Sequence, residues 1–276
     1  MEELSPKNLQ NRLETPAVSV GNVGQLATDL LISTLWMERI GYIHHESILP
    51  LVGNDPFAHP EADACKVVTS CEVYELKSED LVVIQQRAPF VRGKATSFRK
   101  WLMSWIKEKG FSKVVILTSS HAHERLDRQL GGSQFRYMAS KEIEDKFGER
   151  FHSEELRWQQ LEQRISFPAP SNPQIDVDNS TNGMVYLPGG GIAKSLYEDC
   201  LKESIPAIVM LMFCSEGDNA PDALSLAYHV NDWLGLYDFK PKYDVDGKLL
   251  KPATSWKIPV SWRLLFGSNF DQTLFH

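Results

Sequence analysis

Two turns rich in glycine are the first places in this sequence where chemistry could occur. Gly21 and Gly24 lie in one turn, and Gly189, Gly190 and Gly191 form the other. Each turn lies between an expected strand and an expected helix, where glycine lets backbone N–H groups approach a phosphate. Neither turn matches the dinucleotide pattern G-x-G-x-x-G, and neither is followed by the Lys-Ser/Thr pair of a P-loop. Because tight strand-to-helix connections also need glycine for their backbone geometry, we interpret both turns as structural.

A polar cluster follows the expected strand that ends at Ser119, and α/β proteins often bind ligands at such strand ends. His121, His123 and Glu124 offer zinc ligands, but a zinc site needs further ligands from elsewhere in the chain. Ser119 and Ser120 precede His121, yet adjacent side chains on an extended chain point to opposite faces. No G-x-S-x-G motif supports a nucleophile. We therefore predict neither a catalytic residue nor a metal ligand in this cluster.

Three carboxylates crowd a loop ahead of an expected helix. Glu216, Asp218 and Asp222 follow the apolar run at residues 207–213. Such a group can bind a divalent cation. Negative charge at a helix N-terminus is favourable without any ligand, however. The sequence therefore favours helix capping over a cation site, and we expect no cofactor.

Composition excludes several classes of function. The chain of 276 residues is 42% hydrophobic and carries a formal net charge of −7, with Lys and Arg scattered along it. Nucleic-acid binding needs a concentrated positive surface, so we exclude it. The longest apolar run, residues 207–213, is far shorter than the roughly 20 residues that span a bilayer. The first residues lack a signal-peptide pattern, and four cysteines without C-x-x-C pairing suggest reduced thiols. We expect a cytoplasmic and nuclear protein without membrane contact.

The candidate sites need a scaffold, and the apolar pattern predicts one. Apolar residues spaced three and four apart predict helices at residues 23–35, 98–110, 140–164, 192–200 and 221–236. Short apolar runs predict strands at residues 17–20, 48–52, 72–76, 81–87, 113–119, 184–187 and 207–213. Two of these runs do not alternate with polar residues, as in strands buried on both faces. We predict a single three-layer α/β/α domain with a mostly parallel or mixed sheet over residues 1–268, with loops at about 166–182 and 237–254.

The C-terminal end is the most informative feature outside the expected core. Trp256 and Trp262 flank an apolar stretch that could wrap the domain or contact a partner. The chain ends in Leu274, Phe275 and His276 with a free carboxylate. A groove can bind the two apolar side chains while a lysine or a backbone nest binds the carboxylate. We therefore predict that residues 269–276 are a tail that binds a partner.

Five blocks in order along the chain resemble the proteasome assembly chaperone 2 family. They read PAVSVGNVGQLA from residue 16, LPGGGI from 187, SEGDN from 215, WKIP from 256 and SWRLLFGS from 261. The resemblance therefore covers nearly the whole chain. It implies a nucleoside phosphorylase-like α/β fold with no catalytic role. It also implies a heterodimer with proteasome assembly chaperone 1 that binds 20S proteasome α-subunits, scaffolds the α-ring and prevents its off-pathway dimerisation.

The resemblance also assigns a role to the tail. A related C-terminal motif, consisting of a hydrophobic residue, Tyr and any residue, enters pockets between α-subunits. Leu274, Phe275 and His276 would take these three places, although Phe275 lacks the tyrosine hydroxyl. The alternative is an enzyme on a phosphorylase-like fold that acts on a nucleoside or another small molecule. It would use residues 189–191 for phosphate and His121 or His123 for proton transfer.

Overall fold

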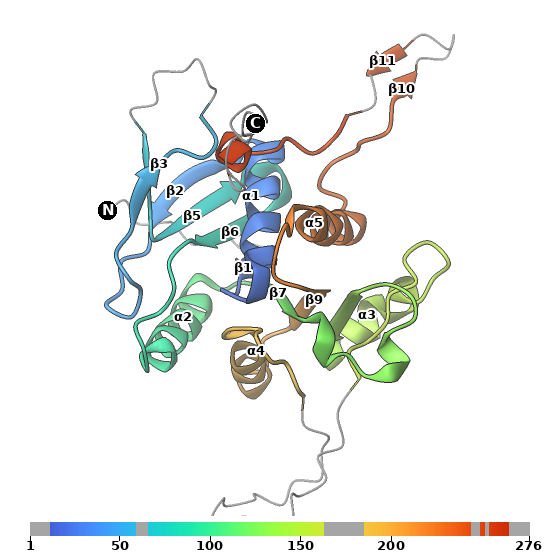
Figure 1. The fold of residues 1–276 in the computed structure, drawn as a ribbon, viewed down its shortest axis with the longest axis horizontal. Coiled ribbons are helices and arrows are strands. Elements are labelled where there is room, and N and C mark those ends of the chain that lie inside the picture. The colour runs from blue at the N-terminus through green and yellow to red at the C-terminus, as the bar shows by residue number, and fades with distance from the viewer. Residues whose placement is uncertain (1–11, 59–65, 163–184, 244–248, 252–253, 265–276) are drawn as a thin grey trace, which may run out of the picture.

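A seven-stranded mixed sheet forms the centre of the protein. The computed structural model describes residues 12–58, 66–162, 185–243, 249–251 and 254–264. Across the sheet the strands are β2 (Glu38–Tyr42), β5 (Cys71–Leu76), β6 (Leu81–Gln86), β1 (Arg12–Pro16), β7 (Lys113–His121), β9 (Ala207–Cys214) and β8 (Phe135–Ala139) (Figure 1). The central strands β6, β1, β7 and β9 are parallel, and β5, β2 and β8 join through antiparallel pairs. The predicted mixed sheet is confirmed.

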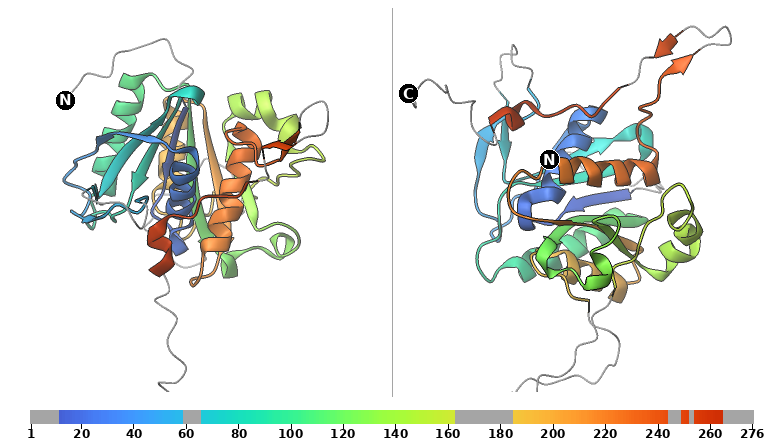
Figure 2. Two further views of the ribbon diagram at one scale, coloured as in Figure 1. Left: turned by 90° about the horizontal axis from the view of Figure 1, so that it is seen from above. Right: turned by 45° about the vertical axis from the view of Figure 1, so that its right-hand side comes forward.

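Helices cover both faces of the sheet and complete three layers. One face carries α1 (Val23–Leu35), α3 (Lys141–Phe151) and α5 (Ala220–Leu234), and the other carries α2 (Ala95–Lys109) and α4 (Ala193–Lys202) (Figure 2). The predicted α/β/α layers are therefore confirmed. None of the described helices combines the length and the apolar character needed to cross a lipid bilayer.

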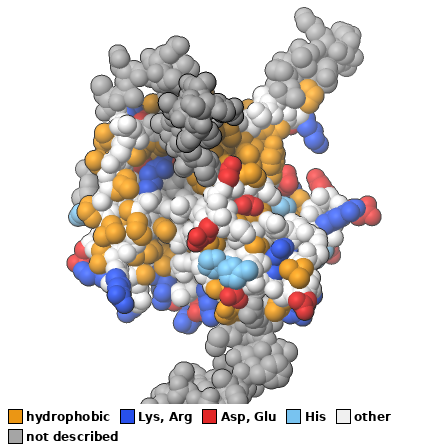
Figure 3. All heavy atoms as spheres, in the orientation of Figure 1, with side chains coloured by type: hydrophobic (Ala, Val, Ile, Leu, Met, Phe, Trp, Pro, Cys, Tyr) orange, Lys and Arg blue, Asp and Glu red, His pale blue; other side chains and the backbone are white. Residues whose placement is uncertain are grey.

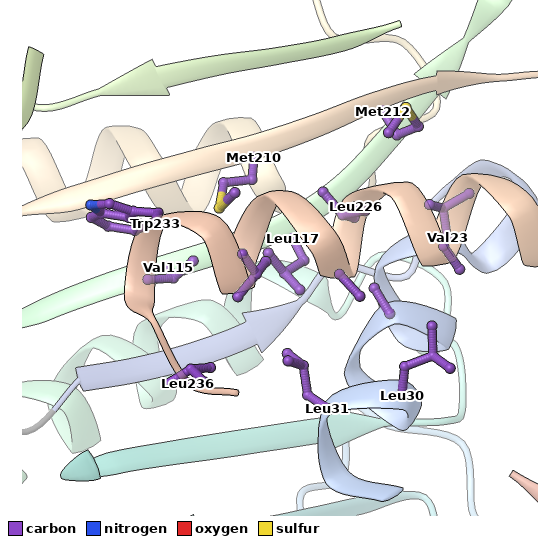
Figure 4. Packing of buried hydrophobic residues seen from close by; sticks show 14 of the residues in the cluster. Val23, Leu30, Leu31, Val115, Leu117, Met210, Met212, Leu226, Trp233 and Leu236 are labelled. Atoms are coloured by element: carbon purple, nitrogen blue, oxygen red, sulfur yellow. The ribbon is translucent and has the colours of Figure 1, made fainter. Parts of the chain in front are cut away.

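The two longest strands are buried on both faces, as their unbroken apolar runs predict. In β7, Leu117 packs in the cluster formed with α1 and α5, whereas Ile116 packs in the cluster formed with α2 and α4. Figure 4 shows Met210 of β9 and Leu117 beside α5, which contributes Leu226 to the same cluster. Leu30 of α1 belongs to the same cluster. Burial on two faces makes β7 and β9 the centre of the core.

The first strand lies earlier in the chain than predicted. β1 spans Arg12–Pro16, whereas the predicted strand at residues 17–20 is a loop that leads into a 3₁₀ turn (Val20–Asn22). Because β1 contains three polar residues and a proline, the apolar pattern gives no sign of it. Glu14 is nevertheless fully buried, since β1 lies between β6 and β7 and beneath α1.

The other differences among strands occur where strands are short or polar. β2 and β8 lie outside every predicted strand, because both contain an arginine and span only five residues. Of residues 48–52, Ile48 forms an isolated bridge and Val52 begins β3 (Val52–Asn54), which pairs with β4 (Val67–Thr69). Residues 185–187 form no strand. The predicted strands at residues 48–52 and 184–187 are therefore wrong, because a loop can bury an apolar run of four or five residues as well as a strand can.

Two longer segments also differ from the prediction. α3 ends at Phe151, and the chain then returns along β8, where Tyr137 and Gln160 form a parallel bridge. A short pairing of β10 (Lys242–Tyr243) with β11 (Leu249–Lys251) lies inside the stretch 237–254 that was expected to be a loop. The predicted loop at 166–182 and the predicted tail at 269–276 lie outside the described residues.

The segment around the two C-terminal tryptophans wraps the domain. Trp256 and Trp262 are buried in the same hydrophobic cluster as residues of α1 and α5. Between them, the backbone N–H of Lys257 donates to Thr34 Oγ1 at 2.9 Å. The Lys257 ammonium also lies 3.3 Å from the ring centroid of Trp36, at the end of α1. The apolar stretch therefore folds back onto its own domain.

Candidate functional site

The two glycine turns meet at one edge of the sheet. β1, β7 and β9 are parallel, so their carboxyl ends lie at the same edge, where α/β proteins usually bind ligands. The backbone N–H of Val20, next to Gly21, donates a 3.0 Å hydrogen bond to the carbonyl oxygen of Gly189. This junction of the two turns, called the glycine junction below, is therefore the first candidate for a site.

Three backbone N–H groups at the glycine junction, those of Val20, Asn22 and Gly190, donate hydrogen bonds within the fold. Asn22 donates its N–H to the Ser19 carbonyl oxygen at 3.1 Å. Gly190 donates its N–H to the Leu187 carbonyl oxygen at 3.3 Å and accepts a 3.2 Å bond from the N–H of Ala193. A phosphate cradle needs N–H groups that point at the anion. These donors therefore hold the turns together.

Hydroxyl groups at the end of β7 serve the same purpose. Thr118 Oγ1 donates to the carbonyl oxygen of Gly190 at 3.1 Å, and Ser120 Oγ donates to the carbonyl oxygen before the three glycines at 2.7 Å. Ser119 Oγ lies 2.7 Å from Ser19 Oγ. A catalytic serine directs its hydroxyl proton at a base. Here the hydroxyls bind carbonyl oxygens and one another, so they position backbone.

The glycines are required because neighbouring atoms occupy the space beside them. A Cβ on Gly24 would lie 2.6 Å from the Leu117 carbonyl oxygen, so glycine lets α1 pack directly on β7. Gly191 has a φ of +59°, and its Cβ would overlap the Val18 carbonyl oxygen. At Gly21, Gly189 and Gly190 the space is taken by the side chains of Asn219, His121 and Leu187 respectively. This packing supports the structural interpretation of both turns.

The histidines after β7 lie beside one another at the glycine junction. The His121 and His123 rings are 5.0 Å apart between centroids, and His123 Nε2 lies 3.9 Å from Glu124 Oε1. Within the described part of the chain, no three His, Cys, Asp or Glu side chains converge as a metal site would require. His121 instead packs against Gly189. The two histidines lie close together, but His123 is exposed and His121 fills the space beside a glycine.

The acidic loop after β9 initiates α5. Asp218 Oδ1 accepts the N–H of Ala220 at 3.0 Å, and Asn219 is the N-cap residue. The Asn219 amide donates to Asp222 Oδ2 at 3.0 Å and to the Ser215 carbonyl oxygen at 2.7 Å. These contacts favour the capping interpretation over a cation site.

The structure shows one exposed apolar surface that the sequence did not predict. Large apolar side chains are exposed around β2, β3 and β4, at one end of the sheet, and Figure 3 shows hydrophobic side chains gathered on this side. They are Tyr42, Leu49, Leu51, Val52 and Val67, and we call them the β2–β4 patch. Leu49, Leu51 and Val52 fall in the predicted strand at residues 48–52, but β2 and β4 were not predicted, so nothing in the sequence indicated that Tyr42 and Val67 lie near them. The predicted tail residues Leu274, Phe275 and His276 lie outside the described part of the chain.

The sequence of this chain is similar to those of known proteins. The chain is 46% identical to proteasome assembly chaperone 2 of Danio rerio and 42% identical to that of Homo sapiens. Each alignment spans 260 residues and covers 94% of this chain and 93% of the relative.

Solved structures share the fold at low sequence identity. The crystal structure of PbaA from Pyrococcus furiosus, described as an archaeal homolog of proteasome-assembly chaperone, superposes with a TM-score of 0.58 and 18% identity. That alignment covers 85% of this chain and 86% of the other. A Thermoplasma acidophilum protein of unknown function gives a TM-score of 0.59 at 19% identity, over 84% and 79% of the two chains. The likeness to nucleoside phosphorylases stays a prediction.

The sequence profile of the PAC2 family matches residues 13–256, which include the whole seven-stranded sheet except Arg12, the first residue of β1. Together with the identity to its curated members, this match shows that the chain belongs to the PAC2 family.

Proposed function

We propose that this chain is a non-catalytic chaperone subunit that promotes assembly of the 20S proteasome in the cytoplasm and nucleus. It pairs with proteasome assembly chaperone 1, binds α-subunits, scaffolds the α-ring and prevents the ring from dimerising off-pathway. The observation that carries the proposal is 41–46% identity, over 94% of this chain, to vertebrate proteins named proteasome assembly chaperone 2. The similarity spans the sheet and its helices rather than one motif.

The glycine junction supports a binding role over an enzymatic one. It occupies the sheet edge where an α/β enzyme would bind its substrate. Side chains and backbone fill the space beside its glycines, and its hydroxyls bind carbonyl oxygens. An enzyme on a phosphorylase-like fold would need donors at this edge that remain available to phosphate. The N–H groups of Val20, Asn22 and Gly190 already donate to carbonyl oxygens within the fold.

The β2–β4 patch supports a protein partner. Soluble monomers rarely expose contiguous apolar surface, and such surface commonly marks a protein interface. The exposed fractions reach 72% for Val52 and 59% for Tyr42. β2 is also an edge strand, so the patch lies where another chain can approach the sheet. We therefore assign this surface to proteasome assembly chaperone 1.

Replacing Val52 by glutamate should weaken the heterodimer at least tenfold, because the interface would then bury an unpaired carboxylate. The exposed side chain allows the variant to fold normally. Titration calorimetry with purified proteasome assembly chaperone 1 measures the dissociation constant. The matched control is Leu201→Glu, which adds the same charge at an exposed leucine of α4, away from the patch. Equal affinity of the two variants would remove the patch from the interface.

The tail contributes to ring binding only together with the domain. Burying Leu274 and Phe275 would yield about 3–6 kcal/mol, and ordering three backbone residues costs about 3–6 kcal/mol. For the tail alone, the free energy gained by burial and the free energy lost by ordering therefore nearly cancel. A docked domain raises the effective concentration of the tail near its pocket, so that even a small net binding free energy of the tail strengthens the complex.

Deleting residues 274–276 should weaken binding to α-rings by about tenfold and leave the affinity for chaperone 1 unchanged. The opposite change is Phe275→Tyr, which restores the hydroxyl of the related motif and should tighten ring binding by about 1 kcal/mol. Biolayer interferometry on purified α-rings measures both effects. Unchanged ring affinity in both variants would show that the tail is passive.

A further inference from the structure

A cavity of about 560 Å³ opens at the edge of the sheet opposite the glycine junction. The residues at its wall come from the start of β1, the loop before β6, the start of β7 and the first turns of α3. They include Arg12, Asp80, Lys113, Glu142, Lys146 and Phe147. Its volume lies in the range of about 300–1,000 Å³ that is typical of small-molecule sites. The cavity is therefore large enough for a ligand that none of the preceding results accounts for.

The ammonium group of Lys113 is the central charge of this cavity. It lies 5.0 Å from the ring centroid of Phe147 and 5.5 Å from that of Trp233. Burial lowers the pKa of Lys113, and repulsion from Arg12 and Lys146 lowers the pKa further. Two aromatic faces compensate only part of the cost of burying a cation. Lys113 is thus a partly buried charge that is repelled by two neighbouring cations.

The carboxylates at the cavity wall do not neutralise this charge. Glu79 forms an ion pair with Arg12 at 3.5 Å. Backbone and Ser140 hydrogen bonds lower the pKa of Glu142, at the first turn of α3. Asp80 also lines the wall. Across the described ranges, no carboxylate lies within ion-pairing distance of either Lys113 or Lys146.

Lys146 provides a second cation beside the first. Its ammonium lies 5.3 Å from the ring centroid of Phe147, the same ring that Lys113 contacts. Lysine binds phosphate and carboxylate oxygens as a point charge. An oxyanion bound by these ammonium groups would supply a negative charge in direct contact with them, which the wall carboxylates do not provide. Ile143 and Phe147 give the same cavity an apolar wall.

We propose that this cavity binds a small molecule that carries an oxyanion, a phosphate or a carboxylate, on an apolar or aromatic body. Lys113 and Lys146 bind the oxyanion, and Phe147 contacts the body. The site lies at the opposite edge of the sheet from the glycine junction, and the inference does not depend on the proposed assembly role.

The test uses the purified full-length chain and three probes of similar size. Phenyl phosphate and benzoate carry the two oxyanions on an aromatic ring, and phenol carries the ring alone. We expect saturable binding of at least one anionic probe with a roughly millimolar dissociation constant by calorimetry, and no saturable binding of phenol. The preferred probe identifies the oxyanion.

Three variants locate the binding. Lys113→Met keeps the aliphatic stem and removes the charge, so it should weaken binding at least tenfold while the melting temperature stays equal or rises. Lys146→Met should weaken binding less, because Lys146 is more exposed. Lys100→Met removes an exposed charge on α2 and should change nothing. Absence of saturable binding for both anions, or equal affinity of all three variants, would overturn the proposal.

Discussion

Replacing Gly191 by alanine is expected to destabilise the fold by about 3 kcal/mol or more. Gly191 has a φ of +59°, which costs alanine about 1 kcal/mol. The added methyl group would also overlap the carbonyl oxygen of Val18, which is backbone and cannot rotate away. The loop that leaves β1 would have to move, and with it the hydrogen bond between Val20 and Gly189.

Gly235→Ala is the matched control for this variant. Gly235 ends α5 with a φ of +67°, but nothing lies within 4 Å of the position of its Cβ. The control therefore shares the backbone cost of about 1 kcal/mol and lacks the overlap. Urea unfolding measures both free energies. If the free energy of unfolding falls by the same amount in both variants, the two turns do not pack as described, and the glycine junction does not have the structural role proposed for it.

Replacing Glu14 by glutamine should stabilise the protein by about 3 kcal/mol at pH 7.5. Glu14 is fully buried in β1, and burial raises the pKa of its carboxyl group from 4.5 to about 8, against a smaller lowering by the Thr28 hydrogen bond. Thr28 Oγ1 lies 2.8 Å from Glu14 Oε1 and 2.9 Å from the Gly24 carbonyl oxygen. A hydroxyl carries one proton, so when Thr28 donates it to the Gly24 carbonyl oxygen, a protonated Glu14 can donate the other bond to Thr28 Oγ1. Glutamine supplies the same donor without titrating.

The contribution of Glu14 to the free energy of unfolding depends on pH. In the unfolded chain Glu14 loses its proton near pH 4.5, whereas the folded protein keeps it until about pH 8. Between these values unfolding releases a proton, so Glu14 lowers the stability as the pH rises, and the effect levels off above the folded pKa. The stability difference between the variant and the original chain should therefore grow from below 1 kcal/mol at pH 5 to about 3–4 kcal/mol at pH 8.

Urea unfolding at the two pH values measures this difference. Glu149→Gln changes an exposed carboxylate of α3 and should show no comparable growth between pH 5 and pH 8. A Glu14→Gln variant that is less stable than the original chain at pH 8 would mean that the buried carboxylate is charged and paired.

The central layers of the fold could be predicted because their signals are local. β7 contains the apolar run Val114–Leu117, β9 is apolar throughout, and α1 carries its apolar residues on one stripe. β1 could not be predicted in this way, because Glu14 and Thr15 are buried by α1 and by neighbouring strands that come later in the sequence. β8 could not be predicted because its second residue, Arg136, is fully buried and binds backbone carbonyl oxygens.

The sequence predicted that each glycine turn is a tight connection, but it could not predict that the two turns contact each other. The composition of each turn predicts a tight connection, whereas the hydrogen bond between Val20 and Gly189 depends on the order of strands in the sheet. The same limit applies to the cavity at the opposite edge. Arg12, Lys113 and Lys146 are unremarkable charges in the sequence, and only the parallel alignment of β1 with β7 brings two of them together.

The central claim is that this protein acts by binding other subunits, and affinity purification from cell extract tests it most directly. The tagged full-length chain, shown to be folded by its melting transition, is recovered and its partners are quantified by mass spectrometry. We predict near-stoichiometric proteasome assembly chaperone 1 together with 20S α-subunits, and loss of chaperone 1 with the Val52→Glu bait. Recovery of neither chaperone 1 nor any α-subunit with the folded original chain would contradict the account.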